Sequence, residues 1–299
     1  MKKLIFLTIG LITPFLFASC NEDGDETTGN GTLKLSITDA PIETDGITAV
    51  NIGVKDVQYH IKDNQWKSLE GFEPDTFNLL ELTGGESELL GQFELGAGNY
   101  TQLRFILDAP EGEQASAIAN PGCYLEFEDG TIQPLFVPSG AQTGYKATGD
   151  FTVPVNGQVS VTADFDARKS VVKAGSSGKY ILKPTIRLVV DNQAGSITGT
   201  VTNIPEGSGI VVYAYENGDY TEEDAAEPEE EAVRFPNAIT NWTIDEEGSF
   251  KLAFLAPGTY DLVVVETIEG EFSQFLKIVE DVQVESLNET VLDIDINDQ

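Results

Sequence analysis

The sequence predicts an all-β protein with two β-sandwich domains, placed after a signal peptide and a flexible tether. From Thr32 onward, apolar and polar residues alternate in short segments, as they do in half-buried strands. Gly, Pro, Asn and Asp separate these segments, and no long stretch has the apolar period of a helix. A length of 299 residues is enough for two domains that each have a core.

The N-terminus predicts a lipoprotein signal peptide over residues 1–19. Lys2 and Lys3 precede an apolar run, Leu4 to Phe17, that is short for a membrane-spanning helix. The run ends in Phe17-Ala18-Ser19-Cys20, which resembles a bacterial lipobox, so we expect cleavage before Cys20 and lipid (palmitate) on its thiol. An ordinary secretory signal with a chance cysteine is the alternative.

Residues 20–30 predict an acidic tether. Asn21-Glu22-Asp23-Gly24-Asp25-Glu26 follows the expected lipidated cysteine at once, and the next residues are polar and without periodicity. An acidic run in this place resembles the surface-export signal of a large group of Gram-negative bacteria. It favours an outer-membrane lipoprotein exposed on the cell surface; a spacer that faces the periplasm is the alternative.

The charge of the chain limits its partners. The formal net charge is −33, and cleavage would remove Lys2 and Lys3 but no acidic residue, which leaves −35. This excludes nucleic acid as a partner and disfavours anionic lipid surfaces, so membrane attachment is expected through Cys20 alone. Cations, basic protein surfaces and neutral glycans remain as possible partners.

The first domain is expected over residues 31–191. Its predicted elements, in order, are strands at Thr32–Ile37, Ile47–Ile61 and Trp66–Leu69, a short strand or helical turn at Phe77–Leu82, and strands at Phe93–Leu95, Leu103–Leu107 and Leu182–Val190. A change of parity between Val54 and Val57 predicts a bulge. Cys123 alternates with Leu125 and Phe127, which predicts a buried thiol that has no disulfide partner.

The second domain is expected over residues 195–299, with the boundary near Ala194. Its strand-turn-strand at Gly248 to Val265 repeats the arrangement around Gly98 and Tyr100, so Tyr100 and Tyr260 are each expected to pack back over a turn. Glu216 to Glu231 is dense in acid and poor in apolar residues, which predicts an exposed loop.

Six segments of the first domain, in order, resemble the bacterial lipoprotein module known as domain of unknown function 4382, from about Gly31 to Val190. They are Leu35–Pro41, Phe77–Leu82, Ala97–Arg104, Val137–Gly140, Asp164–Ala167 and Leu182–Arg187, with Ile37 where the family usually has Leu. The second domain is similar to the carboxypeptidase-regulatory or transthyretin-like sandwich. The first resemblance implies location and β architecture but no catalytic residues, and the second is common in carbohydrate-handling surface proteins.

The sequence argues against an enzyme. His60 is the single histidine, and alternation with Tyr59 and Ile61 places it on the solvent side of a strand. With 50 acidic residues some pair will always have the spacing of glycosidase carboxylates, so no pair can be selected. A glycoside hydrolase is therefore kept only as a third hypothesis.

Two sets of residues are candidate sites. Asp164 and Asp166 flank Phe165 and share one face of a strand, about 7 Å apart; they could bind calcium or form an ion cluster with Arg168, Arg104 or Lys183. The loop from Val137 to Lys146 offers Ser139, Gln142 and Tyr145, the hydroxyl, amide and aromatic groups of a sugar site, although a tight structural loop needs the same glycines and proline.

We therefore predict a lipid-anchored surface protein without catalytic activity that binds a glycan or a partner protein. The alternative, from another class, is a structural or accessory subunit of an outer-membrane assembly. No cofactor is predicted apart from the possible calcium ion.

Overall fold

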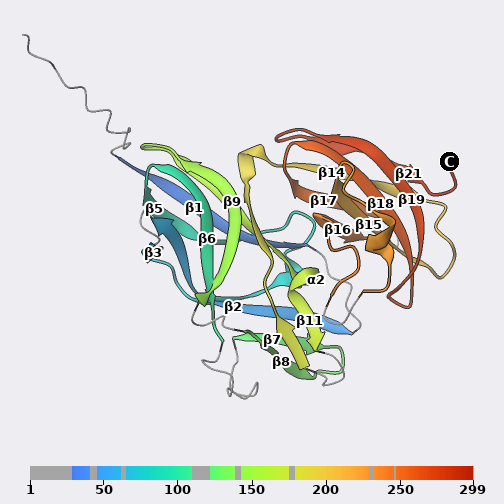
Figure 1. The fold of residues 1–299 in the computed structure, drawn as a ribbon, viewed down its shortest axis with the longest axis horizontal. Coiled ribbons are helices and arrows are strands. Elements are labelled where there is room, and N and C mark those ends of the chain that lie inside the picture. The colour runs from blue at the N-terminus through green and yellow to red at the C-terminus, as the bar shows by residue number, and fades with distance from the viewer. Residues whose placement is uncertain are drawn as a thin grey trace, which may run out of the picture.

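The structure is a computed structural model that describes residues 29–40, 46–61, 65–109, 122–138, 143–174, 179–228, 232–245 and 247–298. Cys20, Ser139 and Gln142 lie outside these residues. The predicted all-β class is confirmed, because almost all regular structure is strand (Figure 1). The strands form two units, each with its own buried apolar core.

The first unit is one 13-stranded sheet that bends around a single core (Figure 1). Its strands are β1 (Asn30–Ala40), β2 (Ile47–Ile61), β3 (Gln65–Ser68), β4 (Asp75–Asn78), β5 (Glu88–Gly96), β6 (Gly98–Leu107), β7 (Cys123–Phe127), β8 (Ile132–Phe136), β9 (Tyr145–Val153), β10 (Gln158–Asp166), β11 (Val171–Ala174), β12 (Lys179–Leu182) and β13 (Ile186–Val190). The order is β11-β12-β8-β7-β2-β6-β9-β13-β10-β1-β5, with β3 and β4 also paired to β2. The layers of the predicted sandwich thus belong to one hydrogen-bonded sheet.

Three local predictions for the first unit are confirmed, whereas the strand expected over Leu182–Val190 is interrupted, because β12 ends at Leu182 and β13 begins at Ile186. The pairing of β2 with β6 shifts register between Val54 and Asp56, which is the expected bulge. Phe77 to Leu82 contains both expected forms, since β4 ends at Asn78 and the 3-10 turn η2 (Leu79–Glu81) follows, capped by the Asn78 side chain. Cys123 is fully buried, and burial raises the pKa of its thiol to about 12.

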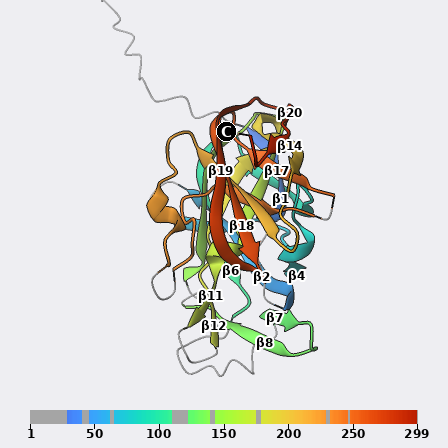
Figure 2. The same ribbon diagram turned by 90° about the vertical axis from the view of Figure 1, so that its right-hand side faces the viewer.

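The second unit is a sandwich of two sheets (Figures 1 and 2). One sheet holds β17 (Ser249–Leu255), β14 (Gly195–Thr202) and β20 (Glu289–Val291) in that order, with β21 (Ile294–Asp295) also on β14. The other holds β16 (Thr240–Thr243), β15 (Gly209–Glu216), β18 (Gly258–Ile268) and β19 (Glu271–Val284). Ile197, Val212 and Val264 belong to the core that both sheets contribute to.

Helices are few and short among the described residues. Besides η2 they are α2 (Ala167–Ser170), η5 (Asp191–Gln193) and η6 (Glu222–Ala225). None of the described helices has the length and apolar character needed to cross a membrane. Of these helices, α2 and η5 matter for the site, because α2 lies at the contact between the units and η5 joins them.

The predicted repeat of the tyrosine corner is confirmed. The Tyr100 hydroxyl donates to the Gly96 carbonyl at 2.8 Å, and the Tyr260 hydroxyl donates to the Ala256 carbonyl at 2.8 Å. In each case the ring packs back over the turn and its oxygen satisfies a carbonyl four residues earlier. The same local device therefore stabilises one corner of each unit.

The acidic segment Glu216 to Glu231 was predicted to be an exposed loop, and its described part, residues 216–228, corrects this prediction. Asp224 is 7% exposed, because its carboxylate caps η6 by accepting from the Thr221 amide and also accepts from Asn237. The Tyr220 ring packs edge-on against Tyr215 at 5.3 Å. The acidic composition alone does not predict this arrangement. One carboxylate serves as a helix cap, and the segment covers the outer face of β15.

Candidate functional site

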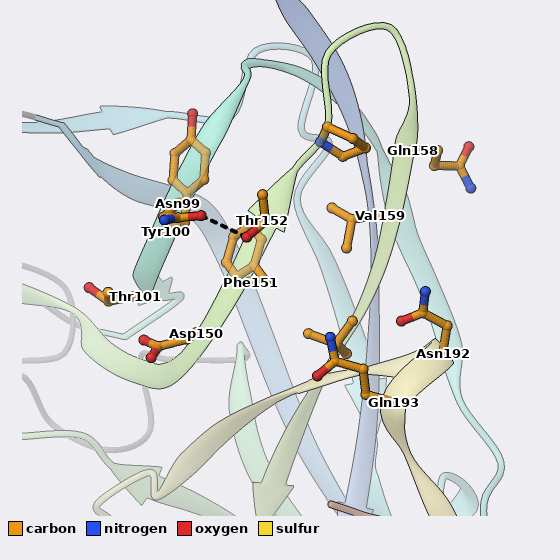
Figure 3. A pocket seen from close by; sticks show the side chains of 12 residues that line it. Asn99, Tyr100, Thr101, Asp150, Phe151, Thr152, Gln158, Val159, Asn192 and Gln193 are labelled. Carbon is orange, nitrogen blue, oxygen red and sulfur yellow. Dashed lines mark hydrogen bonds between the residues drawn. The ribbon is translucent and has the colours of Figure 1, made fainter. Parts of the chain in front are cut away.

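A hollow of about 550 Å³, called the pocket from here on, opens on the first unit (Figure 3). Four neighbouring strands, β6, β9, β13 and β10, and the connecting turn η5 contribute its walls. Its lining residues are Asn99, Tyr100, Thr101, Asp150, Phe151, Thr152, Pro154, Gln158, Val159, Val190, Asn192 and Gln193.

The pocket exists because two adjacent strands diverge. β9 and β13 pair only at Ala147 with Ile186 and at Thr148 with Arg187. At Gly149 the backbones still approach closely, since a Cβ there would lie 2.4 Å from the Leu188 carbonyl oxygen. Beyond this point the strands are no longer paired, and the space between them becomes the pocket.

The floor of the pocket is apolar and its rim is polar. Phe151 is 3% exposed and stacks on Tyr100, with ring centroids 5.3 Å apart. In Figure 3, Asp150 and Thr152 lie on one side of the opening, and Gln158, Asn192 and Gln193 lie on the other. Thr152 donates to Asn99 at 2.7 Å. Within the described residues, the side chains of Gln158, Asn192 and Gln193 have no hydrogen-bond partner in the protein. They are available to a ligand.

The predicted loop residue Tyr145 lies elsewhere. Its ring packs against the core of the first unit, and its hydroxyl donates to the Pro138 carbonyl at 2.7 Å. Burial raises the pKa of Tyr145 to about 12. This residue does not line the pocket, and its role in ligand binding stays a prediction together with those of Ser139 and Gln142.

Asp164 and Asp166 lie at the contact between the two units. Phe165 is fully buried in the core, and Asp164 and Asp166 on the opposite face of the strand are only 4% and 6% exposed. The Arg187 Nε donates to Asp164 Oδ2 at 2.7 Å. Lys169 Nζ lies 3.1 Å and Arg168 Nη2 lies 3.7 Å from Asp166 Oδ2. The face opposite Phe165 is therefore buried and ionic.

The cationic side chains that contact Asp164 and Asp166 also donate hydrogen bonds to the second unit. Arg187 Nη1 donates to the Phe254 carbonyl at 2.8 Å, Arg168 Nη1 to the Arg234 carbonyl at 2.7 Å and Lys169 Nζ to the Ala238 carbonyl at 2.6 Å. We call this set of side chains the ionic joint. It consists of Asp39, Asp164, Asp166, Arg168, Lys169 and Arg187.

The residues around Asp164 and Asp166 bear on whether the two aspartates form an ion cluster or bind calcium. Of the cations expected near the two aspartates, Arg168 is present, while Arg104 instead lies over the Trp66 ring at 4.4 Å. The sequence did not identify Arg187 and Lys169 as partners of the two aspartates. Arg187 faces Asp164 because β13 pairs with β10. No group of three or more possible metal-ligating residues occurs in the part of the chain that the structure describes. Calcium binding stays a prediction.

Among the described residues, Asp39 is the acid of the joint that has no ion pair with a cation. Its Oδ1 accepts from the Ala167 amide at 2.8 Å, while its Oδ2 is buried without a hydrogen bond. Burial raises the pKa of Asp39 well above its usual value; the Ala167 amide opposes this rise, and the carboxylates of Asp164 and Asp166 add to it. Burial also raises the pKa of Asp164, although Arg187 opposes it.

Replacing Asp39 with Asn is expected to stabilise the protein at neutral pH. A carboxyl group whose pKa is raised in the folded state binds its proton more tightly there, so its ionised form destabilises the fold at high pH. This destabilisation decreases as the pH falls through the pKa that Asp39 has in the folded state. The stability advantage of the Asn variant over the wild type should decrease with it. Thermal melts at pH 7 and pH 5 measure this, with exposed Asp219→Asn as the control. A variant less stable than the wild type at pH 7 contradicts it.

Solved structures resemble this chain only distantly. The Bacillus anthracis TIE protein is 13% identical over 89% of this chain and 33% of its own, with a TM-score of 0.21. A leucine-rich repeat protein from Bacteroides thetaiotaomicron is 11% identical over 90% of this chain and 26% of its own, with a TM-score of 0.19. This chain therefore spans a third or less of either protein. The minor pilin GBS52 of Streptococcus agalactiae is 14% identical over 88% of this chain and 94% of its own, with a TM-score of 0.23.

TM-scores this low do not establish a shared fold, so none of these proteins lends this chain an activity. No curated protein matches the sequence. The family comparison is more informative, because residues 30–184 match the domain of unknown function DUF4382 over more than half of the chain. The similarity of the second unit to carboxypeptidase-regulatory sandwiches stays a prediction. The chain belongs to the DUF4382 family.

Proposed function

We propose that this protein is a lipid-anchored, non-catalytic surface protein that binds a neutral glycan in the pocket. The observation that carries the proposal is the free amide rim above an apolar, aromatic floor. Sugars present hydroxyl groups that amides bind and C–H faces that pack on apolar side chains. The predicted lipid on Cys20 would hold this pocket at the outer membrane.

The charge of the pocket favours a neutral ligand. Asp150 is the one charged residue among the described lining residues, and the chain as a whole carries a formal net charge of −33. An acidic polysaccharide would therefore be repelled by both the local and the overall field. Neutral hexose or N-acetylhexosamine polymers carry no such penalty.

Replacing both Asn192 and Gln193 with Ala is expected to weaken glycan binding. Each lost hydrogen bond costs about 0.5–1.5 kcal/mol, so the pair should reduce the affinity roughly 5- to 150-fold. Thermal melts of the protein with a panel of neutral polysaccharides identify the ligand, since binding at a hundredfold excess over Kd stabilises the native state by about 2.7 kcal/mol. Gln65→Ala, an exposed amide outside the pocket, is the matched control. Equal affinities of the double variant and the control would remove the pocket from consideration.

Asp150→Asn is expected to relax the discrimination against acidic glycans. The substitution keeps the shape of the side chain and removes the only formal charge from the described lining, so binding of an anionic polysaccharide should strengthen while that of the neutral ligand changes little. Titrations at low and high salt check this, because the gain should be smaller when charges are screened. Wild-type protein that prefers acidic to neutral glycans would overturn the charge argument.

A further inference from the structure

One wall of the pocket belongs to the segment that joins the two units. Asn192 and Gln193 are part of η5, which lies between β13 and β14. All described residues that line the pocket precede β14, so the second unit contributes no side chain to it. The path of η5 nevertheless depends on where β14 begins. The wall is thus directly followed in the chain by the first strand of the second unit.

This joining segment is held at both ends. On the side of the first unit, Thr162 Oγ1 donates to Asp191 Oδ1 at 2.8 Å. On the side of the second unit, the Leu287 amide donates to the Ala194 carbonyl at 2.8 Å. Gly195 passes so close to the turn before β20 that a Cβ would lie 2.3 Å from the Glu285 carbonyl oxygen. If the second unit moved away, the two restraints on its side would be lost.

The ionic joint keeps the second unit in place. Arg187 lies on β13 about 10 Å along the strand from Val190 in the pocket floor. Its guanidinium joins Asp164 to the Phe254 carbonyl, and Arg168 and Lys169 reach two further carbonyls of the second unit. A separate contact supports this docking, since a Cβ on Gly84 would lie 2.6 Å from the Trp242 ring.

We propose that the second unit is a positioning element for the pocket. The ionic joint docks the second unit, the docked unit fixes the path of η5, and η5 presents the amides of Asn192 and Gln193 to the ligand. The inference rests on the proposed function for the identity of the ligand. The claim that the second unit fixes the path of η5 rests on the contacts alone. It assigns a role in binding to residues of the joint that never touch the ligand.

The test uses the whole chain with three of the six side chains of the joint replaced by apolar ones. The variant Asp164→Leu, Arg187→Met, Lys169→Met removes the Asp164–Arg187 ion pair completely and removes two of the bonds to the second unit. Asp166 loses its pair with Lys169 and keeps Arg168 as its cation. Lys55→Met is the control, because Lys55 is also paired, with Asp108, but is 52% exposed and lies outside the joint.

Two readouts are measured. Amide hydrogen exchange of Ala194 and Leu287 should become at least about tenfold faster in the joint variant, while the core amides of β2 and β15 stay protected. The affinity for the neutral glycan should fall by about tenfold, because the wall is no longer preorganised. The control should match the wild type in both readouts.

The outcomes separate the two proposals. Unchanged exchange at Ala194 and Leu287 in the joint variant overturns the positioning role. Faster exchange with unchanged glycan affinity overturns it as well, because the ligand then does not depend on the path of η5. If the wild type binds no glycan at all, the proposed function fails, whereas faster exchange in the joint variant still supports control of η5 by the second unit.

Discussion

Replacing Arg187 alone with Gln is expected to destabilise the protein by about 3 kcal/mol, the lower end of the usual cost of breaking a buried ion pair, because the Arg187 side chain is 28% exposed. The reason is the position of Asp164, which is 4% exposed and receives its only side-chain hydrogen bond in the described structure from Arg187. Gln cannot neutralise that carboxylate and cannot also reach the Phe254 carbonyl. Denaturant unfolding monitored by fluorescence measures the loss.

Two further variants make this prediction specific. Lys55→Gln breaks a pair whose side chains are 52% and 41% exposed, and exposed pairs contribute about 0–1 kcal/mol. The double variant Asp164→Leu, Arg187→Met should recover most of the stability, because it removes both charges together. If Arg187→Gln costs no more than Lys55→Gln, Asp164 does not depend on Arg187 for its charge compensation.

Gly199→Ala is expected to destabilise the sandwich of the second unit strongly. A Cβ at this position would lie 1.6 Å from the Leu292 carbonyl oxygen and 3.0 Å from the Phe250 ring. The backbone between β20 and β21 would have to move away from β14, which would break the pairing of Thr198 with Val291 and of Val201 with Ile294. Such backbone displacement is expected to cost about 3 kcal/mol or more, above the usual range for overpacking.

Gly258→Ala is the matched control for Gly199→Ala. Gly258 also lies in a strand of the second unit, but a Cβ there would meet only Tyr260 at an ordinary 3.7 Å. Circular dichroism and thermal melts of both variants give the comparison. Equal melting temperatures of the two variants would show that the contact at Leu292 relaxes freely.

The fold class and many local features were predictable from the sequence because they depend on near neighbours. Alternation placed Val54 and Cys123 in the core, and the change of parity after Val54 located a bulge. A Tyr two residues after a Gly predicted the corners at Tyr100 and Tyr260. Membership in the DUF4382 family could be inferred from six short segments in order.

The pocket and the ionic joint could be found only in the tertiary structure. The pocket is formed by β6, β9, β10, β13 and η5, and nothing in their local sequences tells that β9 and β13 stop pairing after Thr148. Alternation correctly put Asp164 and Asp166 opposite Phe165, but only the docking of the second unit buries that face. Burial by a distant segment has no local signature, because it depends on which surfaces meet and not on the spacing of residues along the chain.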